Sequence, residues 1–210
     1  MIGLAGAANA AVIITESSTA PVGAAISQPD FSAPGFNGGQ DFSDNAGPSG
    51  QTFTPATNLS LKNVAVKGFA NNVASFGNLP ASFTVTISQV NGTTLTQLSQ
   101  EVSNSFNPVD GSDYYTFALA SPVVLTAGTQ YAFDISTTAG YFGFAKSSTD
   151  DYAGGSAFQA GSVSRTSTTR ETITNVQCVD RTFFINTPEP ASLSFIGLGM
   201  VTPLARRRRA

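Results

Sequence analysis

The chain has no histidine, no tryptophan and only one cysteine, Cys178. Without histidine it cannot carry a serine-histidine-aspartate triad, a histidine general base or an imidazole metal ligand. A single cysteine excludes a thiolate zinc site and an intramolecular disulfide. The lack of tryptophan removes the side chain that carbohydrate-binding sandwiches commonly present. The absence of histidine and of a second cysteine therefore argues against an enzyme.

Charge is also scarce, since only 11% of the residues are charged and the formal net charge is −3. If residues 188–210 are set aside, six basic and twelve acidic residues remain, which gives −6. A mildly acidic domain offers no electrostatic surface for nucleic acid. We therefore expect no nucleic-acid partner.

Apolar and polar residues alternate over much of the chain, with 16 phenylalanines supplying most of the aromatic content. Phe83–Ile87, Tyr115–Leu119 and Tyr131–Ile135 each have apolar residues at every second position, typical of a strand with one buried face and one wet face. Asn91-Gly92 follows the first of these strands and predicts a tight hairpin. Leu59–Val66 contains a slip in the alternation at Lys62-Asn63, which predicts a β-bulge.

Shorter apolar segments at Phe142–Phe144 and Phe183–Ile185 bring the total to about eight strands, and no segment has a convincing helical period. This spacing favours an all-β fold, a jelly-roll-like antiparallel β-sandwich, with a barrel as the second choice. Residues 20–50 are rich in proline and glycine and predict a long loop or an extended edge segment. Residues 147–172 predict a second irregular stretch.

Carboxylates are the remaining residues with chemical potential. No two of them stand out as a catalytic pair, so we expect no enzymatic activity and no cofactor. Calcium is the one metal the composition allows, because it takes carboxylate and carbonyl oxygens from loops. Candidate ligands are Asp150 and Asp151 in one loop, or Asp41, Asp44 and Asn45 in another. Ordinary solvated turn residues are the alternative interpretation.

Three tyrosines are candidates for binding a ligand at the surface: Tyr114, Tyr141 and Tyr152. Each lies out of phase with the expected core positions or in an expected loop. An exposed tyrosine of this kind can stack on a sugar ring, but it can also be an incidental surface residue.

The C-terminal 23 residues have three parts in a fixed order: Pro188-Glu189-Pro190, an apolar run from Ala191 to Leu204, and Arg206, Arg207, Arg208 and Arg209. A helix of about 15 residues rises about 22 Å, which is short of the ~30 Å hydrocarbon core. Gly197, Gly199 and Pro203 weaken it further. The run can be held briefly in a membrane with the arginines on the cytoplasmic side, but it predicts only transient membrane contact.

This ordered set resembles the PEP-CTERM signal of Gram-negative bacteria, in which a transpeptidase-like membrane enzyme, exosortase, cuts near the Pro-Glu-Pro. The resemblance implies an exported protein that is processed by such an enzyme and left at the cell surface or outside the cell. Residues 1–10 agree with export, because Ala8-Asn9-Ala10 has the small-x-small form of a signal-peptidase site. A flexible N-terminus is the alternative for this segment.

The ordered motifs between Gln51 and Ile185 resemble the choice-of-anchor domains of exported bacterial proteins. Those motifs are Gly50–Phe53, Leu59–Val64, Phe83–Ile87, Tyr115–Phe117, Val123–Phe133, Asp151–Phe158 and Asp180–Phe184. We thus expect a signal-peptide remnant at 1–10, one sandwich domain at 11–187 and a sorting signal at 188–210. The expected role is structural or adhesive, in the surface layer or a biofilm matrix. A carbohydrate-binding module for extracellular polysaccharide is the alternative.

Overall fold

The computed structural model describes residues 11–29, 41–42, 49–68, 82–107, 112–137, 143–147, 152–160, 169–170, 173–174 and 180–186. These residues form strands and connecting turns and contain no helix. Among them, accordingly, no helix is long and apolar enough to cross a membrane. The strands are β1 (Ile13–Ser17), β2 (Ile26–Gln28), β3 (Asp41–Phe42), β4 (Ser49–Phe53), β5 (Leu59–Lys67), β6 (Phe83–Asn91), β7 (Thr94–Val102), β8 (Tyr114–Leu125), β9 (Tyr131–Thr137), β10 (Gly143–Phe144), β11 (Ala157–Ala160), β12 (Thr169–Arg170), β13 (Ile173–Thr174) and β14 (Phe183–Ile185).

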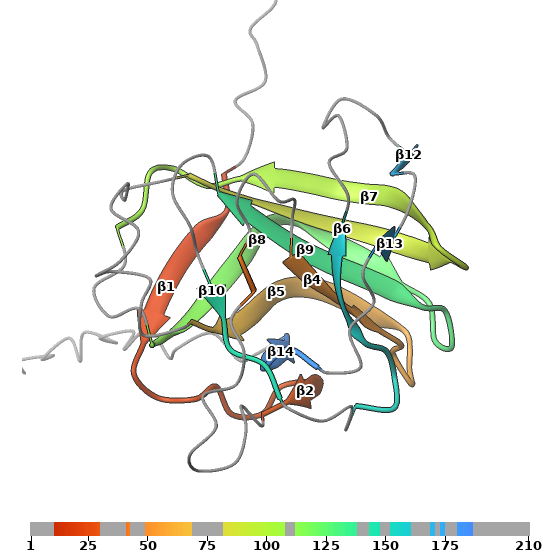
Figure 1. Ribbon diagram of the computed structural model, residues 1–210, viewed down its shortest axis with the longest axis horizontal. Coiled ribbons are helices and arrows are strands. Elements are labelled where there is room, and N and C mark those ends of the chain that lie inside the picture. The colour runs from red at the N-terminus through yellow and green to blue at the C-terminus, as the bar shows by residue number, and fades with distance from the viewer. Residues whose placement is uncertain are drawn as a thin grey trace, which may run out of the picture.

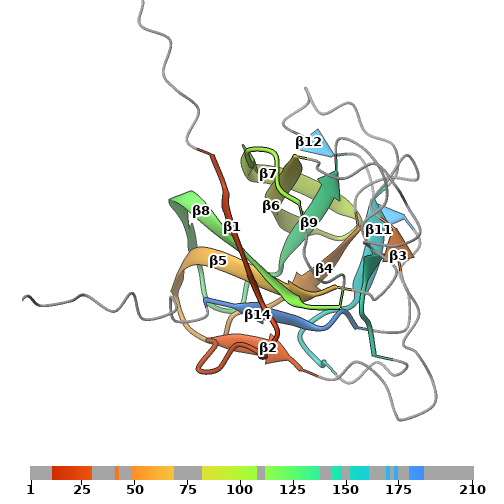
Figure 2. The ribbon, with the colours of Figure 1, turned by 90° about the vertical axis from the view of Figure 1, so that its left-hand side faces the viewer.

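The strands form two main antiparallel sheets packed face to face, which confirms the β-sandwich (Figures 1 and 2). One sheet has five strands in the order β1-β8-β5-β14-β2. The other has seven, in the order β12-β7-β6-β9-β4-β11-β13. The short strands β10 and β3 pair separately. Non-consecutive neighbours within each sheet mean that most pairings join segments far apart in the sequence.

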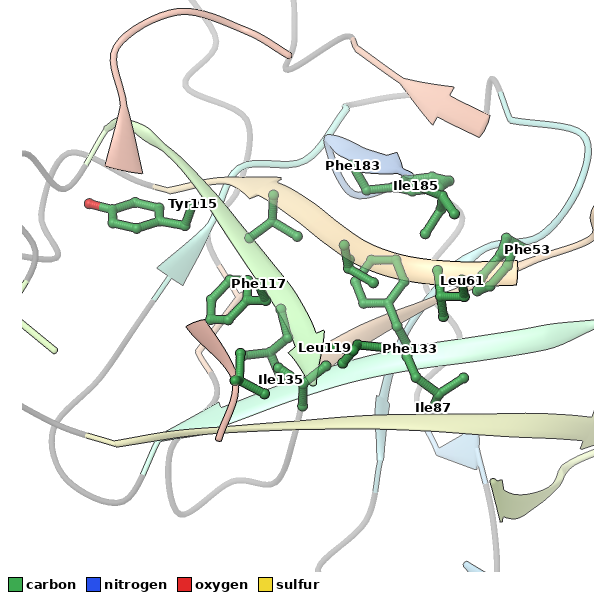
Figure 3. Close-up of a cluster of buried hydrophobic side chains, with 14 of the residues drawn as sticks. Phe53, Leu61, Ile87, Tyr115, Phe117, Leu119, Phe133, Ile135, Phe183 and Ile185 are labelled. Carbon is green, nitrogen blue, oxygen red and sulfur yellow. The ribbon is translucent and has the colours of Figure 1, made fainter. Parts of the chain in front are cut away.

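Aromatic and branched side chains from both sheets fill the space between them (Figure 3). Two pairs of rings cross that space: Phe133 and Phe183 have centroids 5.6 Å apart, and Phe83 and Phe117 have centroids 5.7 Å apart. Each fully buried phenylalanine of this kind stabilises the fold by about 1.5–3 kcal/mol relative to an exposed one. The alternation in β6, β8 and β9 correctly predicted this core face, including Phe117, which is 0% exposed.

Two local predictions are also confirmed. β6 and β7 form a hairpin that turns at Gly92, whose φ of 59° lies in the left-handed region that glycine adopts without strain. The pairing of β5 with β8 shifts register between Leu61 and Asn63, at the predicted place, and the extra residues lie on β8, where 119–122 stand opposite Lys62. Lys62 therefore has no register partner on β8.

The prediction of a wet outer face on the second sheet is wrong. Thr84, Thr86 and Ser88 of β6 are all buried, as is Asp134 of β9, which faces the same way. An apolar cluster lies on this face, formed by Val90, Leu95, Ala132 and Phe158. Hydroxyl groups can be buried when they find hydrogen-bond partners, as Thr86 does with the Gln100 amide at 3.2 Å. Alternation alone therefore could not separate a polar buried face from a solvated one.

Both expected irregular stretches contain strands. Residues 26–28 form the edge strand β2, which is in keeping with an extended edge segment, but residues 49–50 already belong to the interior strand β4. Within 147–172, the expectation of irregular structure is wrong for β11, which pairs with β4 and β13. Gly50 lets β11 approach, because a Cβ there would overlap the Phe133 carbonyl oxygen and lie 2.7 Å from the Phe158 ring.

Candidate functional site

The strand β14 occupies an interior place in the five-stranded sheet. It pairs with β5 on one side and with β2 on the other. Phe183 and Ile185 point into the core, whereas Phe184 packs on the opposite face against Tyr114, with ring centroids 5.9 Å apart. Both edges and both faces of this three-residue strand are therefore covered. The fold depends on the residues that come immediately before the C-terminal tail.

A buried polar network precedes β14. The Asp180 carboxylate accepts a hydrogen bond from the Gln51 side-chain amide at 2.8 Å and one from the Tyr152 backbone N–H at 2.7 Å. The Gln51 side-chain oxygen accepts from the backbone N–H of Arg181 at 2.8 Å. Asp180 and Gln51 are completely buried. Buried carboxylates need such partners because an isolated charge away from water is costly, so this network joins β4, the 152–156 turn and the approach to β14.

Asn186 holds the point at which the chain leaves the sheet. Its side-chain Oδ1 accepts from the Lys62 backbone N–H at 2.7 Å, and its Nδ2 donates to the Ser60 carbonyl at 2.7 Å. Its own backbone N–H donates to the Asn63 carbonyl at 3.0 Å. These three bonds fasten Asn186 to β5 beside the register shift. We call this arrangement the Asn186 latch.

The backbone of Asn186 has a φ of 51°, the only positive value at a non-glycine residue in the described part of the chain. Asparagine is one of the few residues that adopts this region, because its short polar side chain can bond to nearby backbone. The conformation ends the strand β14 and redirects the chain after Ile185. The sequence alone hardly indicates this role of Asn186, because an asparagine after an apolar strand is common. The β5 residues to which it bonds also lie more than 120 residues earlier in the chain.

The expectation that Tyr114 is exposed is wrong. It is 7% exposed, because its ring packs against Phe184 in a cluster that Ala20 and Ala24 also join. The Lys67 ammonium lies 4.4 Å from the ring centroid. Burial raises the pKa of the Tyr114 hydroxyl above its ordinary value. Tyr114 lies out of phase with the core, as predicted, but a second apolar cluster on that face covers it.

Tyr152 is half-buried, and its ring packs edge-on against Phe183 with centroids 5.2 Å apart. Burial is the main cause that raises the pKa of its hydroxyl. A backbone hydrogen bond from Thr54 opposes that rise, and the Asp180 charge adds to it. Tyr152 thus supports the core with one side of its ring. Tyr141 lies outside the described residues, so Tyr114 and Tyr152 are not seen to join it in a common platform.

The calcium candidates stay predictions. Asp150, Asp151, Asp44 and Asn45 lie outside the described residues, and of Asp41 only the backbone is described. Within the described ranges, no three histidine, cysteine, aspartate or glutamate side chains come together in a way that could hold a metal ion. Cys178 and the tail residues Pro188, Glu189, Pro190 and Arg206–Arg209 also lie outside the described part.

The tail is identified by comparison with protein families. Residues 186–209 match the PEP-CTERM protein-sorting motif. Searches of curated proteins and of solved structures found no match. The PEP-CTERM motif implies processing by exosortase and export to the cell envelope or surface of a Gram-negative bacterium. It begins at Asn186, so the latch joins the folded domain to the first residue of the sorting motif.

Proposed function

We propose that this protein is an exported structural or adhesive component of the cell surface or the extracellular polysaccharide matrix, without catalytic chemistry of its own. The observation that carries the proposal is the PEP-CTERM match that follows directly on a completed β-sandwich. The β-sandwich is then the part that is delivered, and the tail is the signal that directs its sorting. The apolar run holds the tail transiently in the membrane until an exosortase-type enzyme releases the domain.

Three of the described carboxylates support a structural role, because their hydrogen bonds hold strands together. Asp180 is bonded to Gln51 and Tyr152, as described above. Both oxygens of Glu101 accept from the backbone N–H groups of Ala120 and Ser121, at 2.7 and 3.2 Å, which ties β7 to β8 across the two sheets. Glu16 accepts from the Tyr115 hydroxyl at 3.3 Å. Carboxylates engaged in this way stabilise a domain that has no disulfide.

The resemblance of the motifs between Gln51 and Ile185 to choice-of-anchor domains also supports a role at the cell surface. A test is cell fractionation in the native host, comparing the complete chain with one that ends at Thr187. The complete chain should be found at the surface or in the matrix, and the shortened chain should stay in the periplasm or be lost to the medium. The same distribution for both chains would contradict the proposal.

The alternative is a carbohydrate-binding module for extracellular polysaccharide. The burial of Tyr114 weakens it, and Tyr152 and Tyr141 remain its candidate aromatic residues. A glycan array separates the two functions. Saturable binding of one polysaccharide that is lost in Tyr152→Ala favours the module, whereas no binding favours the structural role.

A further inference from the structure

The two most exposed large apolar side chains in the described part of the molecule belong to segments that are bonded or paired close to the Asn186 latch. Val124 pairs with Ser60, whose carbonyl accepts from Asn186, and it is 79% exposed. Val22 is also 79% exposed and lies three residues before Ala25, whose N–H donates to the Ile185 carbonyl at 2.9 Å. No other large apolar side chain in the described ranges exceeds 66% exposure. We call Val22, Ser60, Lys62 and Val124 the exit surface.

The segments that contribute to the exit surface carry almost no charge. Lys62 is the one charged residue in the stretches 18–26, 55–63 and 119–130, and it is exposed. The carboxylate that reaches toward this region, Glu101, is bonded to two backbone N–H groups of β8. These stretches contain no acid, so they carry no charge that an anionic lipid headgroup layer would repel. The net negative charge of the domain is therefore carried elsewhere.

The length of the connection brings this surface close to the membrane. Only residues 187–190 separate Asn186 from the apolar run that begins at Ala191. The five residue steps from Asn186 to Ala191 span at most about 18 Å when fully extended. Because the latch fixes Asn186 to β5, the connection starts from a defined point on the domain. A tether this short also gives weak contacts a high effective concentration.

We propose that, before the tail is removed, the exit surface faces the membrane and that Val22 and Val124 contact the lipid headgroup layer. This inference rests on the proposed function, since it requires the apolar run to be held in the membrane. The occupant of the surface is the lipid that receives the tail. Processing would then release the domain from a defined orientation, with β7 on the side away from β2 and β14 (Figure 1).

The test places a fluorescent label at single positions of the full chain. In a Cys178→Ser background, Val22→Cys and Val124→Cys report on the exit surface. Leu98→Cys and Val102→Cys on β7 are matched controls, because these residues are also exposed and apolar, at 43% and 47%. Each labelled chain is incorporated into vesicles of phosphatidylethanolamine and phosphatidylglycerol that carry a headgroup quencher. We expect a blue shift and quenching at positions 22 and 124, and neither at positions 98 and 102.

Two further samples separate the contribution of the apolar run from that of the Asn186 latch. A chain that ends at Pro190 should lose the quenching at position 124, because it lacks the apolar run. Asn186→Ala in the full chain should reduce the difference between positions 124 and 102, since the latch no longer fixes the exit. If the full chain floats with vesicles but quenches equally at all four positions, the orientation is wrong. If it does not float at all, the membrane step of the proposed function fails, and the inference fails with it.

Discussion

Asn186 and Lys62 meet where the last strand leaves the sheet, with the Lys62 backbone N–H donating to Oδ1 of Asn186 over 2.7 Å. Lys62 lies at the register shift between β5 and β8, and Asn186 is the first residue of the PEP-CTERM match. Their contact means that the folded domain extends up to the sorting motif without an intervening linker. The Asn186 side chain thereby bonds to the β5 backbone where its pairing with β8 is irregular.

The latch should contribute measurably to stability. Asn186→Ala removes two hydrogen bonds and puts alanine at positive φ, so it should lower the free energy of unfolding by about 1–3 kcal/mol. Asn186→Gly removes the same bonds without that strain and should cost less. Urea denaturation measures both. Asn58→Ala is the matched control, because Asn58 makes one comparable bond to the Ala127 N–H at 2.9 Å. An Asn186→Ala midpoint equal to that of the unmodified protein would contradict the latch.

The core should be sensitive to truncation at Phe117. This ring is completely buried and packs against Phe83 of the opposite sheet. Phe117→Ala should cost about 3–5 kcal/mol through lost burial and the cavity left behind. Val124→Ala, on the same strand but exposed, should change stability by less than about 0.5 kcal/mol. Equal effects of the two substitutions in urea denaturation would mean that the core face is misassigned.

Alkaline pH should destabilise the domain through Tyr114 and Tyr152. Burial raises the pKa of both hydroxyls above the ordinary value of 10.0, so the folded state holds its protons where the unfolded chain has begun to lose them. This contribution is fully present below pH 10 and is lost as pH rises through the folded-state pKa. Tyr114→Phe with Tyr152→Phe should flatten the fall of the urea midpoint above pH 10. An unchanged slope would mean that these hydroxyls do not couple to folding.

Calcium binding can be tested by melting. An ion that binds only the folded state stabilises it by about 2.7 kcal/mol at a hundred times its dissociation constant, and each kcal/mol moves Tm by roughly 2–4 °C for a domain of this size. Millimolar calcium should therefore raise Tm by several degrees over a chelator. Asp150→Asn with Asp151→Asn should abolish the gain if that loop is the site, and Asp41→Asn with Asp44→Asn should abolish it if the other loop is the site. Identical melting in calcium and in chelator would make these aspartates ordinary turn residues.

The sequence predicted those parts of the fold that depend on local pattern. Alternation identified the core faces of β6, β8 and β9, Asn91-Gly92 predicted the hairpin, and the slip at Lys62 predicted the bulge. Each of these signals lies within a few residues of the feature that it specifies. The PEP-CTERM tail could also be predicted from the sequence, because its three parts follow one another in order.

Features that depend on distant pairing were not predictable. Nothing near Thr86 or Tyr114 indicates that apolar clusters cover their faces, since the covering side chains come from other strands. The place of β14 between β5 and β2 joins segments more than 100 residues apart. The roles of Asn186 and Asp180 follow from those pairings, so only the folded structure brings them together with Lys62 and Gln51.

The most direct test of the account is the intact mass of the exported protein isolated from its native host. If an exosortase-type enzyme processes the tail, the mature chain should end near Pro188-Glu189-Pro190, with β14 and Asn186 retained and Arg206–Arg209 absent. An exported form that still carries the four arginines would contradict the assignment of these residues as a sorting signal.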